Sequence, residues 1–274
     1  FPKFLKNCVK TGVKIAQDEG YCDGLMVYIG LPGNFPPGRR ILVKKGSGMQ
    51  IITKNEKFDQ SDITDWILTE ISNKNNIYFI NDALSQAIGG VRQLWSDVFK
   101  NKRALYVGPG TGLGGALIDI GNSPTQISPI GDGHIYDVMI KGDDGEEKMA
   151  EDRISGRYIH EKCDVSAKEI SESDELWRNH YQVIDRMGDD LVTLILTLMT
   201  GKFKKNNNEN NWVENDQLKI KDVDLILLGG SIATRGRIGE FLLDKLKSKI
   251  NLPILPIKDT IESALIGLDM IDIG

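Results

Sequence analysis

The sequence predicts an α/β fold, because short apolar runs that read as buried strands alternate with longer stretches of helical periodicity. Residues 25–29 and 77–80 are such runs in the first third of the chain. The last third repeats the alternation as strand, helix, strand and helix at 224–230, 236–249, 252–256 and 261–271. No short repeat is visible, which disfavours a solenoid, and 274 residues suffice for one large domain or two ordinary ones.

The elements between these ends follow in order. A helix within 59–74 places Ile63, Trp66, Ile67 and Ile71 on one face. A second helix over 83–100 is expected to be interrupted near Gly89-Gly90, because glycine weakens helices. Two β-patterned runs at 103–108 and 115–121 then flank a glycine loop, and a long helix follows at 176–201. The polar stretch at 206–211 predicts a surface insertion.

Composition narrows the functional classes. A net charge of −5, from 39 acidic and 34 basic residues, provides no basic field, so no nucleic-acid partner is expected. The cluster at 202–205 is expected to be solvated surface. Three cysteines at wide spacings, Cys8, Cys22 and Cys163, fit neither a disulfide framework nor a metal motif, and favour the cytoplasm. No apolar run is long enough to predict a membrane span, so no membrane association is expected.

The stretch "GPGTGLGGALIDIG" at 108–121 contains six glycines. Gly110, Gly112 and Gly115 satisfy G-x-G-x-x-G, but a dinucleotide site requires a helix directly after the loop, and a strand pattern follows here. The lysine and hydroxyl of a P-loop are also missing. The remaining interpretations are a hairpin whose tip, Gly110-Thr111-Gly112, binds an anion, or a bare turn.

Two further turns favour the binding interpretation. Gly229-Gly230-Ser231 follows one predicted strand, and Asn81-Asp82 follows another. Strand ends are where α/β folds place the groups that contact ligands. The sequence therefore predicts a site shared by several turns.

The order of these motifs resembles that of the bacterial glucokinases and the related ROK (repressor, open reading frame, kinase) sugar kinases. That resemblance implies an α/β, two-domain actin and hexokinase-like (ribonuclease H-like) fold. The stretches that carry it are "GLMVYIGLPGN", "IYFINDALSQAIGG", "ALYVGPGTGLGGALIDIG", "PIGDGHIYDVM", "EDRISGRYI", "DLILLGGSIATRG" and "IESALIGL".

The resemblance implies an ATP-dependent hexose kinase of carbohydrate metabolism, with Mg²⁺ on the phosphates and glucose as the first candidate substrate. Asp82 would be the general base that takes a proton from a sugar hydroxyl as this hydroxyl attacks the γ-phosphate. The sugar hydroxyls would be bound by Asn81, Asp132, His134 and Glu151. ATP would be bound by Gly110, Thr111, Gly112, Gly229 and Gly230. No residue is assigned as a metal ligand.

Each side chain also has a simpler interpretation. Asp82 could cap the helix that follows it, which is a common role for Asp at a strand-to-helix junction. His134 could be an ordinary core or surface histidine. Glu151 lies in an acidic stretch that is typical of an exposed helix start.

The sequence departs from the family pattern in four places. The family's opening Asp-x-Gly-Gly-Thr turn does not occur, and residues 1–20 resemble the helix that should follow the family's first three strands. Asp132 or Gly131 occupies the place of a family glutamate. The zinc-binding cysteines of many ROK members are missing between His134 and Glu151. The loop "KKGSGMQII" lacks the usual asparagine, which leaves the identity of the sugar open.

These features predict a smaller, truncated N-terminal domain at 1–82 and a larger domain at 83–274. The last helix, at about 260–274, could pack back on the first domain, and a homodimer is a candidate assembly. The absence of the turn has two interpretations. The sequence could be a fragment, which Phe1 in place of Met favours, or the protein could have lost the turn and with it much of its kinase activity. The alternative function is accordingly a sugar-sensing pseudokinase or a ROK-type regulator, and a third is another enzyme of this fold.

Overall fold

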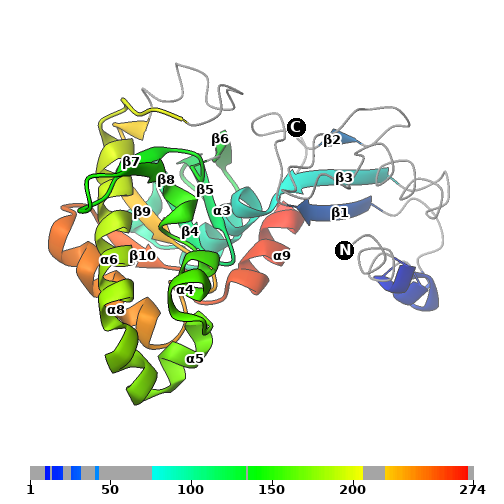
Figure 1. The fold of residues 1–274 in the computed structure, drawn as a ribbon. Helices are drawn as coiled ribbons and strands as arrows, with labels where there is room; N and C mark the ends of the chain where they lie inside the picture. Colours follow the sequence, from blue (N-terminus) through cyan, green and yellow to red (C-terminus); the bar gives the residue numbers. More distant parts are fainter. Residues whose placement is uncertain are drawn as a thin grey trace. The chain divides into compact units, whose positions relative to one another are not determined.

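Figure 1 shows the computed structural model of the protein, which describes residues 10–12, 14–20, 26–31, 41–42, 76–133, 135–205 and 220–270. The chain divides into two compact units, Phe1–Asp82 and Ala83–Gly274. Each unit has its own β-sheet.

The first unit contains a three-stranded sheet with the order β1-β3-β2. β1 (Met26–Leu31) and β3 (Asn76–Asn81) pair in parallel, and the short β2 (Ile41–Leu42) pairs antiparallel with β3. The strands predicted at 25–29 and 77–80 are therefore confirmed. The helix predicted within 59–74 lies outside the described residues.

The second unit is built on a five-stranded sheet with the order β10-β9-β4-β5-β6. β10, β9 and β4 run parallel, whereas β4, β5 and β6 form an antiparallel meander. The bounds are Lys102–Pro109 for β4, Leu113–Ile120 for β5, Ile127–Gly133 for β6, Leu225–Leu228 for β9 and Ile254–Pro256 for β10. This sheet confirms the four strands predicted at 103–108, 115–121, 224–230 and 252–256.

Several helices of this unit begin at serine caps. Ser155, Ser166 and Ser173 each accept a backbone N–H at the start of a helix, and Ser166 forms a capping box with Glu169. The helices are α3 (Asp82–Gln93), α4 (Gly156–Cys163), α5 (Ala167–Glu172), α6 (Asp174–Met199), α8 (Gly236–Lys249) and α9 (Thr260–Met270). Short 3₁₀ turns, η1 (Asp97–Phe99) and η2 (Ala150–Asp152), and a two-stranded hairpin, β7 (Met139–Lys141) and β8 (Glu147–Met149), complete it.

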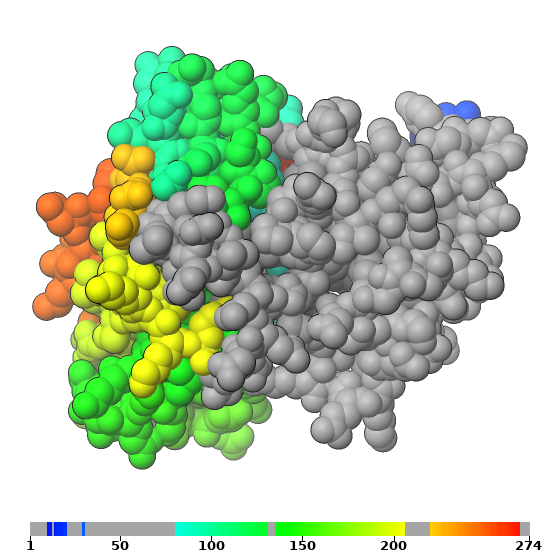
Figure 2. All heavy atoms as spheres, turned by 90° about the horizontal axis from the view of Figure 1, so that it is seen from above, coloured from blue at the N-terminus to red at the C-terminus, as the bar shows by residue number. Residues whose placement is uncertain are grey.

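Helices cover both faces of the five-stranded sheet. Alternate residues of a strand point to opposite faces, so the contacts of β4 show which helices lie on each face. Leu105 and Val107 of β4 join a core cluster with residues of α4, α5, α6 and α8. Tyr106, between them, instead reaches α3, where its hydroxyl donates to Oε1 of Gln86 at 2.6 Å. Seen from above, the atoms of this unit from α3 (cyan) to α8 (orange) are closely packed (Figure 2).

The predicted interruption of the second helix is wrong, since α3 runs unbroken through Gly89 and Gly90. The reason is tertiary packing. A Cβ on Gly89 would overlap the carbonyl oxygen of Ser263 in α9, and a Cβ on Gly267 in α9 would overlap the carbonyl oxygen of Ser85 in α3. The glycines therefore allow close approach of two helices, and this packing outweighs their weak helix propensity.

The interpretation of residues 202–205 as solvated surface is wrong for its last member. The side chain of Lys205 is only 4% exposed and lies 3.1 Å from Oδ1 of Asp137, which is also buried. Lys204, by contrast, is 79% exposed. Among the described residues, no helix is both long and apolar enough to cross a membrane.

Candidate functional site

The glycine stretch forms the predicted hairpin. β4 and β5 pair without a break from Lys102 opposite Ile120 to Pro109 opposite Leu113, and Gly110-Thr111-Gly112 forms the tip. The tip is closed by the Gly110 N–H, which donates to the carbonyl of Gly112 at 2.8 Å.

The second glycine turn lies directly beside this tip. β4 and β9 are parallel, with Val107 opposite Leu228, so their carboxyl ends lie at one edge of the sheet. Gly229 donates its N–H to the carbonyl of Val107 at 2.9 Å, and Ile232 donates to that of Pro109 at 3.1 Å. Gly230 has a φ of 78°, a left-handed conformation that favours glycine. The structure thus brings together two turns that are 120 residues apart in sequence, as Gly110 and Gly230 show.

Tyr106 packs against the residues that lead into both turns. Its ring and hydroxyl are so close to Gly108 and Gly229 that a Cβ at either position would overlap them. The side chain is 1% exposed, and its hydroxyl is bonded to Gln86 of α3. This role could not be predicted from the sequence, because an aromatic residue in a buried strand looks like ordinary core.

The start of α4 holds the hairpin tip from the side. Gly156 donates its N–H to the carbonyl of Gly110 at 2.7 Å, and Arg157 donates to that of Thr111 at 3.4 Å. Ser155 caps α4 by accepting the N–H of Tyr158 at 3.2 Å. The amides of the first turn of α4, which have no partner within the helix, thus fix two carbonyls of the tip.

Glu151 lies at the same tip. Its Oε2 accepts the Leu113 N–H at 3.4 Å and would lie 3.0 Å from a Cβ on Gly112. Its Oε1 accepts a hydrogen bond from Nη2 of Arg157 at 2.8 Å. The side chain is 16% exposed and belongs to η2, so the interpretation of Glu151 as part of an exposed helix start is wrong.

The other predicted site residues are placed less completely. Asn81 ends β3 of the first unit and is buried, and Asp82 is the first residue of α3, a position that also suits the capping role. Asp132 pairs with Ala116 near the end of β6. His134 lies outside the described residues. Among those residues, no three His, Cys, Asp or Glu side chains gather as a metal site would require.

No protein-family profile and no curated protein matches the sequence of the chain. Solved structures do match its fold. A ROK hexokinase from Thermus thermophilus has a TM-score of 0.57 at 15% identity, covering 98% of this chain and 84% of that one. A ROK family glucokinase from Streptomyces griseus, solved with glucose and AMPPNP, has a TM-score of 0.56 at 16% identity, covering 97% and 86%.

A third match has a different function. A ROK family transcriptional regulator, a homologue of the E. coli MLC protein, has a TM-score of 0.56 at 14% identity, covering 98% of this chain and 68% of the regulator. The structure and these matches confirm the predicted α/β fold of the actin and hexokinase type. The same fold serves kinases and a regulator, so the site must decide between them.

Proposed function

We propose that this chain is a member of the ROK and glucokinase group and a cytoplasmic, ATP-dependent sugar kinase, with glucose as the first candidate substrate. The observation that carries the proposal is the meeting of the hairpin tip, the Gly229-Gly230-Ser231 turn and Glu151 at the carboxyl ends of β4 and β9. Ligands of open α/β sheets bind at such an edge.

The tip suits a phosphate group for two reasons. Gly110 and Gly112 carry no side chain that would keep an anion away from the backbone of the tip. The carbonyls of Gly110 and Thr111, which would repel an anion, are already bonded to amides of α4. Thr111 adds a hydroxyl, and Gly229 and Gly230 would line the adenosine side.

Sugar binding and proton transfer fall to the polar side chains. Glu151 would accept hydrogen bonds from sugar hydroxyls beside the phosphate tip, together with Asn81, Asp132 and His134. Asp82 would take the proton of the attacking hydroxyl at a carboxylate oxygen. The new bond then joins the sugar oxygen to the γ-phosphorus, and the bond from that phosphorus to the leaving oxygen of ADP breaks.

Mg²⁺ would neutralise charge on the phosphates. Proteins usually hold this ion through the substrate phosphates, water and one or two carboxylates.

The second candidate is a sugar-responsive regulator or pseudokinase. A transcriptional regulator shares the fold. Such a protein would keep the sugar site and respond to its occupancy without turning over ATP.

One experiment separates these functions. ADP release from Mg²⁺-ATP is measured against a panel of hexoses and N-acetylhexosamines for the unmodified chain, Asp82→Asn and a control, Asp97→Asn, whose carboxylate is 90% exposed. We expect Asp82→Asn to lower kcat by about 100-fold or more with little change in sugar affinity, because it removes a base and keeps the shape. The control should match the unmodified chain.

A sugar that raises the melting temperature without any ADP release would favour the regulator. Equal loss of sugar binding and turnover in Asp82→Asn would assign Asp82 a structural role instead. The proposal would be overturned if the unmodified chain showed no ADP release with any sugar and no rise in melting temperature with any sugar.

A further inference from the structure

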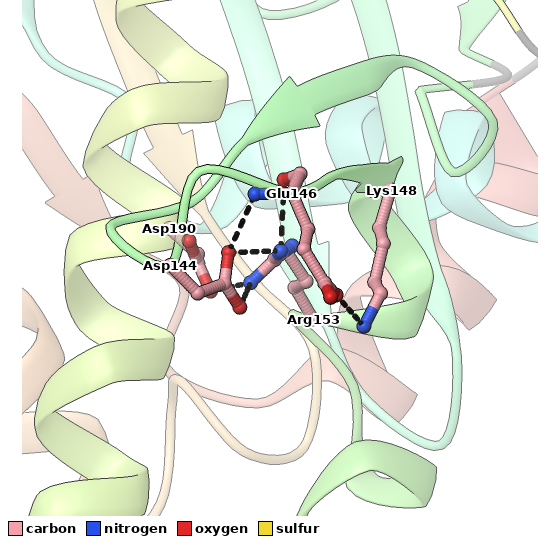
Figure 3. Close-up of polar contacts among 5 residues, drawn as sticks. All are labelled: Asp144, Glu146, Lys148, Arg153 and Asp190. Atoms are coloured by element: carbon pink, nitrogen blue, oxygen red, sulfur yellow. Dashed lines mark hydrogen bonds and ion pairs between the residues drawn. The ribbon is translucent and has the colours of Figure 1, made fainter.

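A buried arginine lies beneath the turn that joins β7 and β8 (Figure 3). Arg153 is 3% exposed, and its guanidinium donates to both carboxylate oxygens of Asp144 at 3.1 and 2.7 Å. It also donates to the carbonyl of Glu146 at 2.9 Å. The same Nη1 that donates to Asp144 also lies 3.6 Å from Oδ2 of Asp190 in α6, which makes an ion pair without a hydrogen bond. The chain bends so closely over the guanidinium that a Cβ on Gly142 would overlap it.

The ion pairs of Arg153 with Asp144 and Asp190 matter to the fold because the guanidinium is buried. A buried guanidinium is tolerated only when it is paired and hydrogen-bonded. Burial opposes the charged form of Arg153, but the hydrogen bonds of Asp144 and the charge of Asp190 outweigh this and raise its pKa. The hydrogen bond from Arg153 lowers the pKa of Asp144 to about 2. Two carboxylates and a carbonyl therefore hold one side chain in place.

This side chain joins three segments of the second unit, namely the β7–β8 turn, helix α6 and the chain just after η2. Arg153 follows η2 directly, and Glu151 lies inside η2. The other end of η2 is held by backbone bonds, from Ala150 to the carbonyl of Val138 at 2.8 Å and from Glu151 to that of Tyr136 at 3.0 Å. Glu151 is therefore fixed from both sides, and Arg153 supplies the side-chain half of that restraint.

We propose that Arg153 is a positioning residue for the sugar site, because it holds η2 so that the carboxylate of Glu151 stays beside the glycine tip. This inference rests on the proposed function, which assigns Glu151 to the sugar. The phosphate tip contacts Glu151 through the Leu113 N–H, but it also has supports that do not involve Arg153, from amides of α4 and from the turn after β9. Loosening Arg153 should therefore weaken the binding of sugar more than that of ATP.

The test replaces Arg153 with lysine, which keeps the charge but cannot form two parallel bonds to Asp144. The matched control is Arg103→Lys. Arg103 also binds a carboxylate by two hydrogen bonds, to Asp119 at 2.7 and 3.1 Å, but it lies near the opposite end of β4 from the tip. Both variants lose the same kind of contact, and only one of them loses it next to Glu151.

Amide hydrogen exchange over residues 147–152 and the KM values for sugar and ATP are then measured. For Arg153→Lys we expect about tenfold faster exchange in this segment, since its anchor is weakened. The KM for sugar should rise by roughly tenfold, a typical effect of losing support around a binding group, and the KM for ATP should change less than about twofold. The control should change neither exchange nor either KM.

Unchanged exchange at 147–152 in a folded Arg153→Lys protein would overturn the inference. So would equal rises in both KM values, or the same effects in the control. If Arg153→Lys does not fold, Asp144→Asn provides the test, because Asp144 is 35% exposed and its removal opens the same contact from the turn. If the unmodified chain shows no sugar-dependent ADP release, the proposed kinase function fails, whatever the role of Arg153. Amide exchange at 147–152 is then compared between the unmodified chain and Arg153→Lys, with and without sugar, and this comparison still decides whether Arg153 holds the segment for a bound sugar.

Discussion

Replacing Asp190 with asparagine should change the pH dependence of stability. Relative to the unmodified chain, the variant should be more stable at neutral pH than at acid pH. Asp190 is 2% exposed in the middle of α6, and burial raises the pKa of its carboxyl from 3.8 to about 6. The nearby charge of Arg153 acts in the opposite direction but does not cancel the burial, while Asp144 and Asp143 add to the rise. The folded chain therefore favours the neutral acid, and asparagine has nearly the same shape as that acid.

The magnitude follows from this change in pKa. A rise of about two pKa units corresponds to about 3 kcal/mol, at 1.36 kcal/mol per unit. Below pH 3.8 the carboxyl is neutral in both the folded and the unfolded chain. Between 3.8 and about 6 only the folded chain keeps the proton, so the free energy of unfolding falls as the pH rises. Above about 6 the full cost is present, and asparagine avoids it.

The measurement is urea unfolding, followed by tryptophan fluorescence, at several pH values from about 4 to 8. The difference in unfolding free energy between Asp190→Asn and the unmodified chain should rise by up to about 3 kcal/mol over this range. Any pH-independent cost of losing the charge beside Arg153 shifts the whole curve and leaves this rise intact. The matched control is Asp189→Asn, on the same helix, where the carboxylate is 39% exposed and lies 2.7 Å from Lys245. A difference that stays flat or falls with pH would refute the reasoning.

Two further predictions concern glycines that permit close contacts. Gly89→Ala should destabilise the second unit by about 1–3 kcal/mol, because the added methyl overlaps the carbonyl of Ser263, and thermal unfolding will measure the loss; a gain in stability, as expected of alanine in an open helix, would contradict the packing. Gly229→Ala should raise the KM for ATP because the methyl displaces the turn from Tyr106, and Gly229→Ala combined with Tyr106→Leu should recover part of that loss; a double variant as impaired as the single one would contradict this role of Tyr106.

The long helices and the central strands of the second unit were predictable from the sequence, because hydrophobic periodicity reports local structure directly, whereas the elements from β6 to α5 were not predicted. The helix at 236–249 was predicted at the bounds of α8, and the two strand patterns around the glycine run form the β4–β5 hairpin. Glycine content alone was misleading at Gly89-Gly90, since the sequence does not show that α9 packs against this part of α3. The local reading also missed the burial of Lys205, whose partner, Asp137, is distant in sequence.

The residues of the candidate site likewise fall into those that could be predicted from the sequence and those that could not. Glycines mark their own turns, so Gly110 and Gly229 could be picked out from the sequence, and their positions after predicted strands indicated a shared site. Tyr106, Arg153 and Arg157 carry no local signal, because their roles depend on partners brought close only by the fold. Asp144, nine residues from Arg153, shows that even a nearby partner is hidden when a turn creates the contact.

The glycine turns, which the sequence reveals, depend for a physical reason on the supporting residues, which it does not reveal. Glycine gives a turn close access to a ligand, but it has no side chain that could hold the turn in position. The position of such a turn must then be fixed by its surroundings, and here Tyr106 packs against Gly108 in β4 and Gly229 after β9, while amides of α4 hold the tip. Glu151, which has a side chain, is instead fixed through its backbone and through Arg153. A site made of glycine turns is therefore only as precise as the buried residues around it, and these are the residues whose substitution should separate sugar binding from ATP binding.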